Sequence, residues 1–315
     1  MWFVYVAVAL VLVIVGGLYL RARLTAALTA LGVRPRPVRV VRWAFVWLVY
    51  GVPVIMIASI LVGVAIGSDS FPQFDGPIGT WLLLFPFTCA LLVTVQVVPW
   101  VLAIDLAWWI VRRRRDVATA NRLRTFAVLA ALAVFTVYTP VRILVERGEL
   151  RLREHRVVVS PTAKAPFRIA FVADIQQDRH TDAARAREVY AMLNAKRPDV
   201  VLSGGDWINM GPDHIESAAA TAAQLESRLG TFSVRGDHEH FAHGLDRERS
   251  VADVERAMKR HGVVMVNDEV RWFEHDGKRI AVLFINHNYP APTTKATVDR
   301  LIGEAHGADY TIAIT

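Results

Sequence analysis

The sequence has a single cysteine, Cys89, and it lies in an apolar run. A lone cysteine excludes an intramolecular disulfide and a zinc site built from several thiolates, and it leaves the redox compartment open. Internal repeats and low-complexity tracts are also missing. With 54% hydrophobic and 21% charged side chains and a mean hydropathy of +0.33, the 315-residue chain is too apolar for a disordered or a purely soluble protein.

Acidic side chains are scarce in the first half of the chain. Residues 1–145 hold 4 Asp and Glu against 13 Lys and Arg, whereas residues 146–315 hold 25 against 23. The net charge of +7 and the pI of 9.8 therefore belong to the first half. A nucleic-acid groove needs positive charge clustered on the folded, soluble part, and that part is slightly acidic. We therefore expect no nucleic-acid partner.

Four apolar stretches are long enough to cross a bilayer, which takes about 20 helical residues. They are Trp2 to Leu20, Trp43 to Gly67, Thr80 to about Trp100, and Phe126 to Val145. We predict a four-helix transmembrane region over residues 1–145, a linker over 146–166 and a second domain over 167–315. A cleaved signal peptide is the alternative for the first stretch. Arg21 and Arg23 follow its apolar core instead of preceding it, which favours a membrane anchor.

The distribution of arginine between the loops predicts the orientation. Residues 21–42 carry six arginines and residues 111–124 carry six more, whereas the loop 68–79, with Asp69 and Asp75, has none. Positively charged loops stay in the cytoplasm. We therefore expect a multi-pass protein of the cell membrane, in contact with the lipid bilayer, whose N-terminus and C-terminal domain are both extracytoplasmic.

One carboxylate, Asp105, falls within the third apolar stretch. Carboxylates inside a membrane commonly mark ion or proton paths. Asp105, however, lies near Trp108, Trp109 and the run Arg112 to Arg115, which favours an ion pair at the membrane interface. The spans hold no further acidic or histidine side chains to build a relay, so a transporter-like role has little chemical support.

Short β-rich runs alternate with amphipathic segments after the linker, as in an α/β domain. The predicted strands are Arg168 to Ala173, Asp199 to Ser203, Thr231 to Val234, Arg279 to Ile285, and Asp309 to Ile314. The predicted helices are Thr181 to Lys196, Ile215 to Leu229, Val251 to His261, and Thr294 to His306. Asp276 and Gly277 form a hairpin signal between Val270 to Glu274 and Lys278 to Ile285.

A carboxylate follows each of the first three strands: Asp174, Asp206 and Asp237. Ligand sites in open α/β sheets lie beyond the carboxyl ends of the strands, so these side chains can meet in one cleft. They would repel one another unless a divalent cation lay among them. Taken singly, each Asp also fits a turn or a helix cap. Two of the three follow glycines, Gly205 and Gly236, that suit close backbone approach to a ligand.

These residues resemble the calcineurin-like metallophosphoesterases, and among them the bacterial members tethered by N-terminal membrane segments. The family pattern is Asp-x-His, then Gly-Asp, then Gly-Asn-His-Asp/Glu. The matching positions read Asp174-Ile175-Gln176, Gly205-Asp206 and Gly236-Asp237-His238-Glu239, in the same order. The resemblance covers about residues 167–315 and says nothing about the membrane helices.

The resemblance implies a layered α/β sandwich that hydrolyses phosphoesters with two divalent metal ions, such as Mn, Fe, Zn or Mg. Asp174 and Gln176 would ligate the first metal, Asp206 would bridge both, and Asp237 would ligate the second. His238 would contact the phosphoryl group and act as the general acid. Two cations can lower the pKa of a bridging water and neutralise charge in the transition state, and a nearby imidazole can protonate the leaving oxygen.

Three departures from the family pattern are visible. Gln176 replaces a histidine, so an imidazole ligand becomes an amide, and Asp237 replaces an asparagine, which adds negative charge. The strand ending at Ile314 should be followed by a ligating histidine and later by a Gly-His-x-His motif, but the sequence stops at Thr315. We therefore expect the domain to be truncated. His287 also follows a strand, and a loop role is the simpler interpretation.

Two functions follow from these patterns. The first is a membrane-tethered phosphoester hydrolase acting on a phosphorylated small molecule or lipid, such as a cell-envelope intermediate. The alternative is an inactive, family-like binding or sensory membrane protein with a degraded metal site. Gln176 and the missing histidines favour the alternative, whereas Asp206 and the run Gly236 to Glu239 favour the hydrolase.

Overall fold

The computed structural model describes residues 2–66, 76–158 and 165–315 of the chain. These form two compact units, one from residues 1–62 and 72–149 and the other mainly from residues 150–315. The predicted acidic loop around Asp69 and Asp75 and the part of the predicted linker at Ser160 and Pro161 lie outside the described residues.

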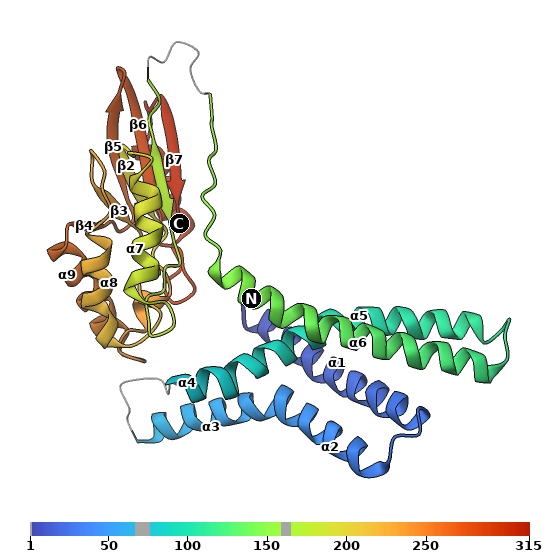
Figure 1. Cartoon of the computed structure of the whole chain (residues 1–315). Coiled ribbons are helices and arrows are strands. Elements are labelled where there is room, and N and C mark those ends of the chain that lie inside the picture. The colour runs from blue at the N-terminus through green and yellow to red at the C-terminus, as the bar shows by residue number, and fades with distance from the viewer. Residues whose placement is uncertain (1, 67–75, 159–164) are drawn as a thin grey trace. The chain divides into compact units, whose positions relative to one another are not determined.

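The first unit is helical throughout its described part (Figure 1). Its helices are α1 (Trp2–Ala30), α2 (Pro35–Val46), α3 (Val52–Ala65), α4 (Gly76–Ile78), α5 (Phe85–Val111) and α6 (Val117–Gly148), with π-helical turns at Trp47–Gly51 and Gly79–Leu84. Four segments are long and apolar enough to cross a bilayer: Leu10–Ala30, Pro35–Ala65, Gly79–Val111 and Val117–Gly148. The four predicted apolar helices are present, and they are longer than the apolar stretches alone.

A small apolar core joins α1, α5 and α6. Leu20, Val97, Val101 and Val128 are buried there, while most other apolar side chains of these helices face outward. Such outward apolar surfaces match a hydrocarbon solvent, in which helices satisfy their own backbone hydrogen bonds.

Asp105 of α5 lies between two arginines of neighbouring helices. Its carboxylate contacts Arg23 Nη2 at 2.6 Å and Arg124 Nε at 2.7 Å, and it accepts a hydrogen bond from the Tyr19 hydroxyl at 2.5 Å. The expected ion pairing is confirmed, but its expected partners, Arg112 to Arg115, are wrong. The first two of that run stack instead on the indole four residues earlier, because residues four apart share one face of a helix.

The second unit contains two sheets. The first is β1 (Ile169–Val172), β2 (Val200–Ser203), β3 (Thr231–Ser233) and β4 (Val263–Met265), all parallel and in this order. The second has the order β5 (Glu269–His275), β6 (Lys278–Phe284) and β7 (Tyr310–Ile314), with β5 antiparallel and β7 parallel to β6. The five predicted strands and the hairpin are present. The three-residue β4 was not predicted, because so short a run shows no alternation.

Four helices accompany these strands: α7 (Ala183–Asn194), α8 (Ile215–Ala222), α9 (Arg247–Arg260) and α10 (Lys295–Glu304), besides short 3-10 turns at Pro212–His214 and His238–His240. Asp182 and Thr294 cap α7 and α10. Helix α8 ends well before the predicted Leu229. The Asn194 side chain donates to the Gln224 carbonyl and accepts from the Glu226 N–H, which holds that segment as a turn.

The side chains of β2 alternate between two cores and so define the layers. Val201 packs with α7, α8 and α9, whereas Val200 and Leu202 face β6, where Val282 and Phe284 are buried. On the outer side of the second sheet, Leu301 of α10 and Ala305, directly after that helix, pack on Ala281 and Leu283. The unit is therefore helices, sheet, sheet and helix, which confirms the predicted layered α/β sandwich. Figure 1 shows α7, α8 and α9 beside the strands.

Candidate metal centre

The parallel register places the carboxyl ends of β1, β2 and β3 at one edge of the first sheet. Three predicted site residues meet there. Asp206, Asp237 and His238 each offer a ligand atom, and these atoms lie within 4.8 Å of one another. Two carboxylates and an imidazole at this spacing are a donor set that suits a divalent cation.

Asp174 and Gln176 reach the same edge through their backbone. The Asp174 N–H donates to the Gly205 carbonyl at 3.3 Å, and the Gln176 N–H donates to the Asp206 carbonyl at 2.7 Å. The carboxylate of Asp174 is exposed and does not belong to the group of three. The loop after β1 therefore runs beside the loop after β2.

Gln176 presents the wrong amide atom for a cation ligand. Its Nε2 faces Asp206 Oδ2 at 3.5 Å. A cation needs the amide oxygen instead, which a half-turn of the terminal amide would supply. The hydrogen bond is long, so little opposes that rotation.

The backbone at this edge has an unusual conformation. Asp174, Gln176 and Asp206 have φ values of 54°, 47° and 58°, all in the left-handed region that side chains other than glycine rarely adopt. Each residue in this conformation costs free energy that the surrounding contacts must offset. Strained backbone conformations of this kind are concentrated at functional sites.

Gly205 and Gly236 allow the loops after β2 and β3 to touch. A Cβ on Gly205 would collide with the backbone of Gly236, and a Cβ on Gly236 would collide with the Asp206 carboxylate. Gly205 also has a φ of 87°. The close approach that these glycines permit is between the two loops, whereas the approach to a ligand stays a prediction.

Glu239 holds the loops together from beneath. Its side chain is fully buried and accepts the backbone N–H groups of Asp206 at 2.9 Å, Trp207 at 2.7 Å and Gly236 at 2.7 Å. Burial raises the pKa of this carboxyl, while the backbone hydrogen bonds oppose the rise. From the sequence, Glu239 was treated only as part of a motif. Its place three residues after Gly236 and next to His238 was the available signal.

The protein surroundings of Asp206 disfavour the ionised form of its carboxyl group. Burial, and after it the nearby charge of Glu239, raise the pKa of the Asp206 carboxyl to about 7, against the hydrogen bond it accepts from the His238 N–H at 2.9 Å. A bound divalent cation would favour the ionised carboxylate. The electrostatics of the site therefore fit a cation.

His238 has one ring nitrogen engaged. Nδ1 lies 2.6 Å from the Asn209 carbonyl oxygen, which accepts a hydrogen bond, so Nδ1 carries the proton. This contact fixes the orientation of the ring. Nε2 is then the ring nitrogen that can exchange a proton or bind a cation. His287, by contrast, is exposed and accepts the Thr293 N–H on Nδ1, as a loop residue does.

The unit is a layered α/β sandwich with a candidate metal site of acidic and imidazole side chains beyond its parallel strands. Residues 167–314 match the family model described as calcineurin-like phosphoesterase. The α/β unit is therefore similar to this family over nearly all of its length, and the resemblance seen in the sequence is confirmed.

Several relatives carry similar segments. A bovine "Transmembrane protein with metallophosphoesterase domain" is 28% identical over 168 residues, covering 52% of this chain and 36% of the relative. The Escherichia coli "Phosphodiesterase YaeI" is 22% identical, covering 52% and 61%. A zebrafish protein with the same description as the bovine one is 26% identical, covering 40% and 28%. The chain thus spans less than two thirds of each of these relatives.

Proposed function

We propose that this protein is a metal-dependent phosphoester hydrolase held at a membrane. The observation that carries the proposal is the group of Asp206, Asp237 and His238, whose ligand atoms lie within 4.8 Å at the carboxyl edge of a calcineurin-like phosphoesterase domain. The bovine relative, described as a transmembrane protein, supports the membrane setting.

We assign two divalent cations to the centre. Asp174 and Gln176 would hold the first, Asp206 would contribute to both, and Asp237 would hold the second. Bound cations would supply a water of lowered pKa and neutralise charge on the phosphoryl oxygens. The part played by His238 follows from its ring: Nδ1–H donates to the Asn209 carbonyl, and the doubly protonated ring gives its Nε2 proton to the leaving oxygen and is left in the neutral Nδ1–H form.

The membrane unit supports a substrate near the bilayer. We propose three segments, with residues 1–145 as the membrane region, 146–166 as a linker and 167–315 as the catalytic domain outside the cytoplasm. A phosphorylated lipid or cell-envelope intermediate suits that setting. A C-terminal reporter that works only in the cytoplasm should stay silent, and its activity would overturn the orientation.

One observation favours a second function. Gln176 stands where the family has a histidine and turns its amide nitrogen toward Asp206. An incomplete first metal position would suit a binding or sensory membrane protein better than an enzyme. The two functions differ in one measurable property, which is metal-dependent turnover.

Hydrolysis of bis(4-nitrophenyl) phosphate by the full chain in detergent, with and without Mn²⁺, separates the two functions. We expect metal-dependent turnover that falls at least about a hundredfold in Asp206→Asn and in His238→Ala. Asp213→Asn is the matched control, because Asp213 is exposed and lies outside the centre. Equal rates in the wild type and both site variants would refute the assignment, and no turnover in the wild type would favour the sensor.

A further inference from the structure

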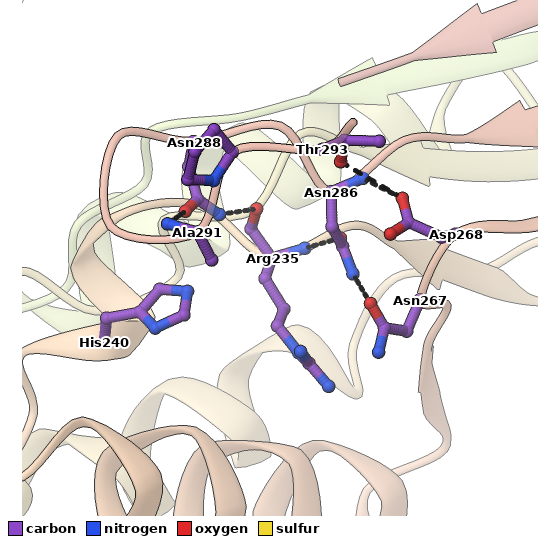
Figure 2. Close-up of a pocket in the computed structure, with 9 residues that line it drawn as sticks. Arg235, His240, Asn267, Asp268, Asn286, Asn288, Ala291 and Thr293 are labelled. Carbon is purple, nitrogen blue, oxygen red and sulfur yellow. Dashed lines mark hydrogen bonds between the residues drawn. The ribbon is translucent and has the colours of Figure 1, made fainter. Parts of the chain in front are cut away.

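A cavity of about 220 Å³ lies next to the candidate metal centre (Figure 2). The run 235–240 connects the two. Its inner residues include Asp237 and His238, and its end residues, Arg235 and His240, line the cavity. Asn288, from the loop after β6, donates to the backbone carbonyl of Arg235 at 3.3 Å and so ties the cavity wall to the same run.

The wall opposite His240 is a fixed polar network. Asn286 accepts the Arg235 N–H at 2.9 Å, donates through its side chain to Asn267 Oδ1, and donates through its N–H to Asp268 Oδ1 at 2.9 Å. Figure 2 shows His240 at one end of the cavity and Asn267 with Asp268 at the other. A wall already held by its own hydrogen bonds is preorganised for a ligand.

His240 lines this cavity and holds a buried polar atom that has no partner among the described residues. Its side chain is only 7% exposed, and within the described part of the chain its Nε2 is buried without a hydrogen-bond partner. Leaving a buried polar atom unpaired costs about 1–3 kcal/mol, so its persistence beside a polar cavity indicates a group that a ligand pairs.

The charges at the cavity are already compensated. The Arg235 guanidinium binds Glu255 at 2.6 Å, and the Asp268 carboxylate accepts from the Asn286 N–H and the Thr293 hydroxyl. A second phosphate would therefore meet little free positive charge. The lining also contains no Phe, Tyr or Trp side chain on which a nucleobase would stack. Neutral hydroxyl groups are the chemistry that remains.

We propose that the cavity binds the leaving group of the substrate and that this group is a small polyol, such as a glycerol or sugar unit. The volume equals that of roughly seven liquid waters, which accommodates a molecule of that size. This inference rests on the proposed function. In the reaction, water forms the new P–O bond, the P–O bond to the polyol breaks, and the polyol oxygen leaves with a proton from His238.

Two soluble phosphodiesters test this inference, one with glycerol as the leaving alcohol and the other with 1-propanol, which lacks two hydroxyl groups. For the wild-type full chain with Mn²⁺, we expect the KM of the glyceryl diester to be about tenfold lower, because a site built to bond hydroxyl groups rejects an analogue without them. His240→Leu should raise the KM of the glyceryl diester about tenfold and so narrow the difference between the two KM values. His240→Gln, which keeps a polar end, should retain most of that difference. His306→Leu, at an exposed histidine, is the matched control.

The outcomes separate the two claims. Turnover of both diesters with equal KM values in the wild type would overturn the polyol pocket and leave the hydrolase in place. An unchanged gap in His240→Leu would overturn it as well. Failure to hydrolyse either diester would overturn the proposed function, and this inference would fall with it. If His240→Leu does not fold, the wild-type comparison and His240→Gln still decide.

The polyol could come from a soluble ester or from a lipid headgroup. Mixed micelles of phosphatidylglycerol offer the same glyceryl group on a lipid. A lower KM for the micelles than for the soluble glyceryl diester would assign the pocket to a lipid headgroup, and a higher one to a soluble ester.

Discussion

The carboxylate of Glu239 accepts the backbone N–H of Asp206 at 2.9 Å, so a fully buried acid positions the residue at the middle of the candidate metal centre. The same carboxylate also binds the N–H groups of Trp207 and Gly236. One side chain thus joins the loops after β2 and β3, and the spacing of Asp206, Asp237 and His238 depends on it.

Glu239→Ala should therefore destabilise the α/β unit by about 3 kcal/mol, because three buried N–H groups lose their acceptor. Urea unfolding of the full chain in detergent measures this change. Glu248→Ala, at an exposed position of α9, should stay within about 0.5 kcal/mol of the wild type. A Glu239→Ala protein as stable as this control would show that Glu239 does not hold the loops.

Gly236→Ala should abolish divalent-metal binding, because a Cβ at this position collides with the Asp206 carboxylate. Isothermal titration with Mn²⁺ checks the effect. Gly303→Ala serves as the control: it lies in α10 with open space around it, and alanine there should stabilise the helix by about 0.5–1 kcal/mol. Wild-type affinity in Gly236→Ala would contradict the geometry described here.

Gln176→His should tighten metal binding roughly tenfold, since an imidazole replaces an amide that presents its nitrogen to Asp206. Histidine is among the side chains that tolerate the left-handed backbone found at this position. The affinity for Zn²⁺ and Mn²⁺ is the measurement, and Gln224→His, at an exposed glutamine, is the control. An unchanged affinity would place Gln176 outside the centre.

Asp105→Ala should destabilise the membrane unit by about 2 kcal/mol, because Arg23 and Arg124 would lose their shared carboxylate in a partly buried setting. Thermal unfolding in detergent reports the loss. Glu146→Ala breaks an exposed pair with Arg142 and should cost less than about 0.5 kcal/mol. Equal unfolding temperatures for the two variants would mean that the Asp105 cluster is not structural.

The sequence predicted those parts of the site that depend on strand order alone. Asp206 and Asp237 directly follow short apolar runs, and parallel strands end at one edge, so their meeting needed no knowledge of side-chain contacts. Four membrane helices were equally accessible, because apolar length is a local property.

Other features depend on contacts between residues far apart in the chain. The burial of Glu239, the left-handed backbone at Asp174 and Gln176, and the choice of Arg23 and Arg124 as partners of Asp105 all follow from tertiary packing. Local sequence patterns do not contain information about such contacts. The run Arg112 to Arg115 was therefore the expected partner of Asp105, and the cavity beside His240 was not predicted.

Equilibrium dialysis of the full chain against Mn²⁺ tests most directly whether the protein holds a divalent-metal centre built on Asp206. We predict saturable binding in the wild type and in the matched control Asp213→Asn, and loss of that binding in Asp206→Asn. Binding by Asp206→Asn with the stoichiometry and affinity of the wild type would contradict the account.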